Sequence, residues 1–141
     1  MDALKNNGIY SIFPESESSY DLDTTVNKLV AEIEARSWNV SFTHDLQQTM
    51  KKHGKDVLPV KVLAICHPSH SGQILEKDHE RVISCMMPCR ISIYKKSDGK
   101  TYVSRMNPAM MSQVMDPLTA QVMQGAAADV EEIIQSALKA E

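Results

Sequence analysis

Two cysteines stand at the ends of apolar segments, where their thiols could meet. Cys66 closes the segment at residues 60–66, and Cys89 opens the segment at residues 89–94. We expect both cysteines on the apolar side of these segments. If these segments are neighbouring strands, the two thiols could come within range of a disulfide or of a shared metal ion. One hypothesis is therefore a thiol site that cycles between dithiol and disulfide, handles sulfur or holds a soft metal.

Three nearby side chains could complete such a site. Cys85 lies four residues before Cys89, whereas His67 and Arg90 each directly follow a cysteine. Cationic groups stabilise a thiolate and so lower the pKa of the thiol. We therefore take Cys66, Cys89 and Cys85 as candidate thiols, with Arg90 and His67 as the residues that would stabilise the thiolate.

Ordinary core packing explains the same cysteines. Unpaired cysteines are among the most buried residue types and behave as small hydrophobic side chains. By strand alternation, Cys89 shares a side with Ile91 and Ile93. A structural zinc site is disfavoured, because its paired Cys-x₂₋₄-Cys units are represented here only by Cys85-x₃-Cys89. Thiol chemistry and packing both stay open.

Methionines flank the second cysteine and the segments that follow it. They are Met86, Met87, Met106, Met110, Met111 and Met115. Thioethers and thiolates together suit Cu(I), but methionine also fills core gaps and adaptable interfaces. The pattern favours core or dimer contact, with Met106, Met110 and Met111 as the candidate interface. The identity of any metal stays unknown, and the sequence requires no cofactor.

No familiar enzyme motif accompanies these residues. The chain has no glycine-rich phosphate loop, no G-x-S-x-G turn and no dinucleotide fingerprint. An acid–base pair of His67 with Asp78 or Glu80 has only the residue types in its favour. The sequence does not decide whether the protein is an enzyme.

Composition narrows the class of protein. The chain has 141 residues, of which 43% are hydrophobic, enough for the core of a single domain over residues 1–141. A net charge of −3 without a basic stripe argues against nucleic-acid binding. No apolar run approaches the ~18 residues that span a membrane, and the N-terminus lacks a signal-peptide core. With only three cysteines, we expect a protein of the reducing cytoplasm.

The first half of the chain predicts strands and helices in alternation. Residues 8–13 are rich in β-forming side chains and predict an opening strand that could resume over residues 15–20. Asp23 or Asp21 is a suitable N-cap for a helix, and an apolar stripe at helical spacing follows. Its members are Val26, Leu29, Val30 and Ile33. The alternation of Trp38, Val40 and Phe42 predicts a half-buried strand.

The second half predicts a central strand, a hairpin and a closing helix. Asp45 and Gln48 have the spacing of a capping box for a short helix, and residues 60–66 are apolar on both sides, as in a central strand. Residues 88–94 and 100–106 flank a Ser-Asp-Gly turn and should pair antiparallel. Asp116-Pro117 opens the last helix, which Gly125 could divide.

Three segments together resemble domain-of-unknown-function family 302. They are Cys66-His67-Pro68, the segment Met-Pro-Cys-Arg-Ile-Ser-Ile-Tyr at residues 87–94, and Gly-Lys-Thr-Tyr-Val-Ser-Arg-Met-Asn-Pro at residues 99–108. The similarity extends over about residues 8–138. The resemblance implies a β-α-β(4)-α order like that of the TATA-binding protein's repeat, with an antiparallel sheet, helices on one side, and dimers. It also implies that Cys66 and Cys89 belong to the subgroup with both cysteines.

Two functional hypotheses follow. In the first, the protein is a small α+β thiol module that uses Cys66 and Cys89 for redox chemistry, sulfur handling or soft-metal binding. In the second, it is a non-catalytic dimerisation or binding module whose cysteines are structural. We expect a homodimer in either case, with its small-molecule or protein partner undefined.

Overall fold

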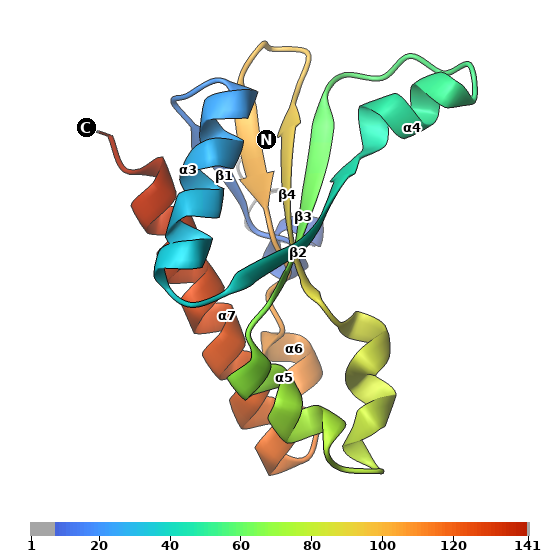
Figure 1. Ribbon diagram of the computed structural model, residues 1–141, viewed down its shortest axis with the longest axis vertical. Coiled ribbons are helices and arrows are strands. Elements are labelled where there is room, and N and C mark those ends of the chain that lie inside the picture. The colour runs from blue at the N-terminus through green and yellow to red at the C-terminus, as the bar shows by residue number, and fades with distance from the viewer. Residues whose placement is uncertain (1–7, 141) are drawn as a thin grey trace.

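The computed structural model describes residues 8–140, the side chain of Met110 excepted. Five strands form one antiparallel sheet in the order β1-β5-β4-β3-β2 (Figure 1). Their bounds are β1 Glu15–Ser18, β2 Asn39–Asp45, β3 Val60–Cys66, β4 Cys89–Lys95 and β5 Thr101–Ser104. The predicted α+β class and antiparallel sheet are confirmed.

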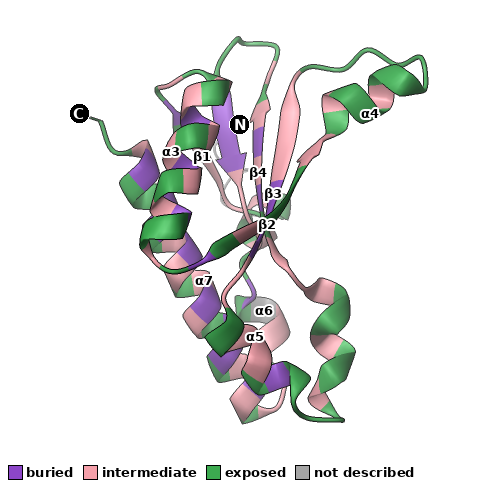
Figure 2. Cartoon of the chain, in the orientation of Figure 1, coloured by how far each residue is buried: buried purple, intermediate pink, exposed green. Residues whose placement is uncertain are grey.

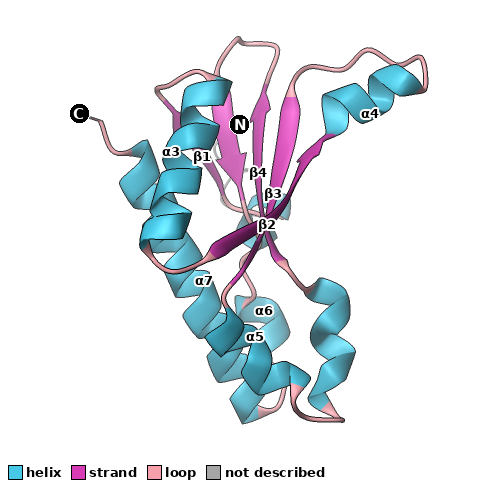
Figure 3. Cartoon of the chain, viewed as in Figure 1, coloured by secondary structure: helices cyan, strands magenta, loops and turns pink. Residues whose placement is uncertain are grey.

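The helices differ greatly in length (Figure 3). The two long ones are α3 Leu22–Ala35 and α7 Pro117–Leu138. The short ones are α2 Ile9–Ile12, α4 Leu46–Lys52, α5 Pro68–Leu75, the 3₁₀ helix η1 Glu80–Met86 and α6 Ala109–Ser112. The strands and the two long helices follow one another as β-α-β-β-β-β-α, the order that the resemblance implies.

The core lies between the sheet and the two long helices. Leu29 and Ile33 of α3 meet Ile133 and Ile134 of α7, and all four are fully buried. The sheet contributes Leu63, Ile65, Ile91, Ile93 and Val103. Buried positions recur along α3 and α7, whereas α4 has none (Figure 2). One face of the sheet is therefore the core face, and the opposite face is called the outer face below.

Side-chain caps start the helices where the sequence predicts. Asp21 accepts a hydrogen bond from the backbone N–H of Thr24 at 2.7 Å, and Asp116 accepts one from Thr119 at 3.1 Å. Asp45 caps α4 through the N–H of Gln48. Each cap satisfies a backbone donor that the first helical turn would otherwise leave unpaired.

The opening strand predicted at residues 8–13 is wrong, because α2 forms there. The N–H of Phe13 donates to the carbonyl of Ile9, and the Ser11 hydroxyl closes the turn onto the carbonyl of Gly8. The first strand begins only at Glu15, which pairs with Ser104 of β5. Local hydrogen bonds thus override the β-forming side chains of this segment.

Two further expectations need correction. A bulge between Val40 and Phe42 shifts the register of β2, so Phe42 pairs with Ala64 on the outer face and is 59% exposed. Gly125 does not divide α7, which runs unbroken to Leu138. A methyl group at Gly125 would lie 3.6 Å from Cε1 of His70, so the glycine marks the place where α7 passes close to α5.

Glu15 anchors the edge strand β1 to the hairpin of β4 and β5. Its carboxylate accepts hydrogen bonds from the Tyr94 hydroxyl and, at 2.8 Å, from Lys96 Nζ, and its side chain is 7% exposed. We expect Glu15→Ala to lower the free energy of unfolding by about 1–3 kcal/mol, because Tyr94 and Lys96 lose their acceptor. Urea denaturation measures the change.

Glu17 provides the matched control on the same strand. Its ion pair with Lys100 is 3.3 Å long and more than half exposed on both sides. Glu17→Ala should therefore change the unfolding free energy by no more than about 0.5 kcal/mol. Equal effects of the two substitutions would show that Glu15 is no anchor.

Candidate functional site

A small cavity lies where β3 ends and β4 begins, beneath α5 and the first turns of α7. Its volume is about 20 Å³. Cys66 and Cys89 both line it, together with Met86, Met87 and Met123. Two thiols and three thioethers from distant parts of the chain thus surround one cavity, which we call the sulfur cavity.

The strand register places the two thiols differently from the sequence-based expectation. Both cysteines were expected on one apolar side of the sheet. Instead, Cys89 pairs with Ile65 on the core face, so the side chain of Cys66, the next residue along β3, starts toward the other side. Cys66 still reaches the sulfur cavity because it is the last residue of its strand, where the chain turns into α5.

Polar contacts fix the side of the cavity that α5 forms. Cys66 Sγ lies 3.3 Å from the Ser71 hydroxyl, within hydrogen-bond range. His70, which lines the cavity, has Nε2 3.1 Å from Asp129 Oδ2 of α7. Trp38 Nε1 donates to the same carboxylate oxygen at 3.3 Å. Asp129 therefore holds both rings in place.

His67 contacts the rings of Trp38 and His70 and does not line the sulfur cavity. Its ring meets Trp38 edge-on at 5.4 Å and lies 4.8 Å from the ring of His70. Its Nδ1 is buried, with no hydrogen-bond partner among residues 8–140. His67 thus belongs to an aromatic cluster at the end of the sheet.

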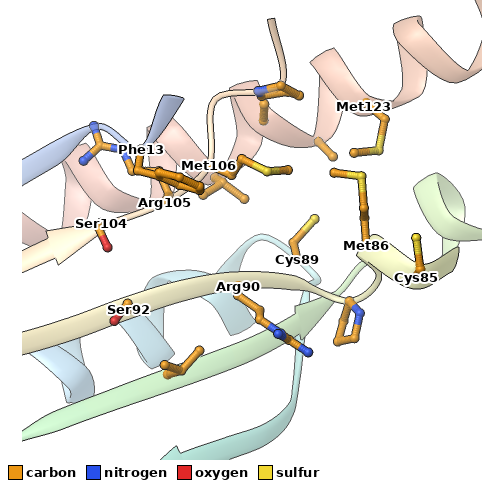
Figure 4. A pocket seen from close by; sticks show the side chains of 16 residues that line it. Phe13, Cys85, Met86, Cys89, Arg90, Ser92, Ser104, Arg105, Met106 and Met123 are labelled. Atoms are coloured by element: carbon orange, nitrogen blue, oxygen red, sulfur yellow. The ribbon is translucent and has the colours of Figure 1, made fainter. Parts of the chain in front are cut away.

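The environment of Cys89 works against a reactive thiolate. Burial raises the pKa of its thiol, and the negative charge that a thiolate at Cys66 would carry raises the pKa further. We expected Arg90 or His67 to lower a thiol pKa, and for Cys89 this is wrong. Arg90 is exposed and points to the outer face, on the opposite side of β4 from Cys89 (Figure 4).

A much larger cleft adjoins the sulfur cavity. Its volume is about 430 Å³, and Cys89, Met86 and Met123 line both spaces. Figure 4 shows Cys89 pointing from β4 toward Met106, Met86 and Met123. Cys89 therefore stands between the sulfur cavity and the larger space, which we call the sheet cleft.

The remaining candidate residues spread over several places. Cys85 is exposed and lines the sheet cleft but not the sulfur cavity. Met106 also lines the sheet cleft, and Met111 of α6 is half-buried. The side chain of Met110 lies outside the described part of the structure.

Two residues that line these spaces could not be assigned to a site from the sequence. Met123 reads as one more apolar residue of the last helix, yet it lines both spaces. Phe13, placed in a strand by its composition, lines the sheet cleft instead. Within the described residues, no three His, Cys, Asp or Glu side chains gather to hold a metal ion. The sulfur donors beside the two thiols at this cavity are the thioethers of Met86, Met87 and Met123.

An antiparallel five-stranded sheet with two long helices on one face, and thiols at one end of that sheet, defines the class of protein. Residues 15–140 match the domain of unknown function DUF302, so the chain belongs to the DUF302 family. No curated protein matches the chain. Over the described residues, no helix has the length and apolar character to cross a membrane.

A solved structure shares this fold. It is the crystal structure of an uncharacterized conserved DUF302 protein from Bacillus stearothermophilus, similar to this chain with a TM-score of 0.73 and 20% sequence identity. The match covers 90% of this chain and 95% of the other. At this identity the likeness establishes the fold alone.

Proposed function

We propose that this protein binds a monovalent soft metal ion, Cu(I), with the thiols of Cys66 and Cys89 as its principal ligands. One observation carries the proposal: both cysteines line the same cavity, in company with the thioethers of Met86, Met87 and Met123. Thiolate and thioether sulfurs are the donors that select Cu(I) over harder metal ions.

The size of the sulfur cavity supports a single ion rather than an organic ligand. A cavity of about 20 Å³ has room for one species the size of a water molecule. Its walls include flexible methionine side chains, which can adjust to a metal ion. Both cysteines are half-buried and form no disulfide, so their sulfurs are free to act as ligands.

The raised pKa of Cys89 favours metal binding over the other thiol chemistries. Redox exchange and sulfur transfer both begin with attack by a thiolate, which is scarce when burial keeps the thiol protonated. A metal ion instead displaces the proton as it binds, so a protonated thiol lowers the apparent metal affinity but does not prevent binding. We therefore rank soft-metal binding above redox or sulfur-handling activity.

Anaerobic titration with Cu(I), against a chromophoric Cu(I) chelator, tests the proposal. We expect Cys66→Ser and Cys89→Ser each to weaken Cu(I) binding by about 100-fold or more, because each removes one thiolate ligand. Cys85→Ser is the matched control: Cys85 is exposed and does not line the sulfur cavity. Its affinity should equal that of the unchanged protein.

The second hypothesis predicts the opposite result. If the cysteines only pack, all three serine variants bind Cu(I) as weakly as the unchanged protein, and the proposal is refuted. Circular dichroism of each variant checks that the fold is retained. The homodimer expected from the resemblance, and a cytoplasmic location, stay predictions.

A further inference from the structure

The sheet cleft lies where β4 loses its neighbour. Ser104, the last residue of β5, pairs with Ser92, so β4 continues from Ile91 back to Cys89 without a partner on that side. The chain beyond Ser104 turns instead toward the segment before β1. There the N–H of Asn107 donates to the carbonyl of Ile12 at 2.7 Å. An opening in the sheet results, connecting its outer face with its core face.

The two ends of this opening differ in chemistry. On the core side the lining is apolar and includes Met106, Met123 and Ala126. On the outer side, the polar residues Ser92, Ser104 and Arg90 line the same space. A ligand that fills the cleft would therefore have a polar end outside and an apolar end inside.

The charged residues that line the cleft determine which charge the polar end of a ligand should carry. Arg105 and Arg90 are the charged residues among the described residues that line the cleft. Arg105 is neutralised: it forms an ion pair with Glu131 and donates a hydrogen bond to Ser16 at 2.7 Å. Within residues 8–140, Arg90 has no carboxylate partner in an ion pair. Its fork of N–H donors matches a carboxylate.

We propose that the sheet cleft binds an aliphatic carboxylate of medium chain length, with the carboxylate on Arg90 and the chain between Met106 and Met123. The cleft volume of about 430 Å³ falls in the range of small-molecule pockets. Methionine walls adapt to a flexible chain, and Phe13 contributes a flat apolar surface. The sheet cleft shares Cys89, Met86 and Met123 with the sulfur cavity, but Arg90, to which the carboxylate would bind, lines only the cleft.

Calorimetric titration of the purified protein with decanoate and with decan-1-ol tests this site. We expect saturable binding of decanoate, and binding of the alcohol that is weaker by about tenfold. Arg90→Gln should weaken decanoate binding by about tenfold and leave the alcohol unchanged. Lys95→Gln, which removes the same charge from the same strand outside the cleft, should leave both unchanged.

Two more variants keep the test decisive. Ala127 is half-buried and lines the cleft, so Ala127→Leu should fill part of it and weaken both ligands. Cys66→Ser should bind decanoate normally, because Cys66 lines only the sulfur cavity. The proposal is overturned if decanoate does not saturate, or if Arg90→Gln and Lys95→Gln have the same effect. Neither outcome bears on Cu(I) binding.

Discussion

Replacing Ile91 with alanine is expected to lower the free energy of unfolding by about 2–5 kcal/mol. Ile91 is fully buried on β4 and pairs with the equally buried Leu63 of β3. Its side chain belongs to the cluster that joins the sheet to α3 and α7. Truncation removes buried methyl groups and leaves a cavity that the surrounding strands and helices cannot close.

The loss of unfolding free energy should be much larger for a core residue such as Ile91 than for a surface residue. Domains are stable by only about 5–15 kcal/mol, so the loss is a large share of the total. Val82 is 72% exposed, and Val82→Ala should change the unfolding free energy by less than about 0.5 kcal/mol. Urea denaturation of both variants measures the difference. A loss at Ile91 as small as that at Val82 would mean that the core is not where the structure puts it.

Much of this fold could be predicted because its signals are local. The apolar stripe around Leu29 and Ile33 predicted α3, and Asp116-Pro117 predicted the start of α7, since both periodicity and capping act within a few residues. The Ser-Asp-Gly turn likewise predicted the pairing of β4 with β5. The prediction for Phe42 was wrong because a bulge moves the side chain to the other face of the sheet, and the hydrophobic alternation of the sequence does not reveal a bulge.

The candidate site could be predicted only in part. Two cysteines at strand ends suggested a meeting point, and both line the sulfur cavity. The strand register determines that the two cysteines approach this cavity from opposite sides of the sheet. The packing of α7 determines that Met123 lines the cavity with them. The raised pKa of Cys89 reflects burial, which sequence proximity to Arg90 does not reveal. A cavity forms where the side chains of packed helices and strands leave a gap, and the types of the individual residues do not predict where such a gap lies.

The apparent affinity for Cu(I) is expected to rise steeply with pH, which follows from the same burial. The ordinary thiol pKa is 9.0, and burial raises that of Cys89 above it, so this thiol is protonated throughout the range from about pH 6 to 8. Cu(I) must displace that proton. Each unit of pH should then strengthen binding by about tenfold for each thiol proton that the metal releases.

The rise should continue through neutral pH, because the raised pKa of Cys89 moves the plateau to more alkaline pH. Competition titrations at several pH values, corrected for the protonation of the chelator, measure the slope. Cys89→Ser should lower it by about one tenfold step per pH unit, since one released proton is lost, whereas Cys85→Ser should leave it unchanged. An affinity that does not vary with pH would mean that the metal finds a thiolate already formed. Burial would then not govern the chemistry of Cys89.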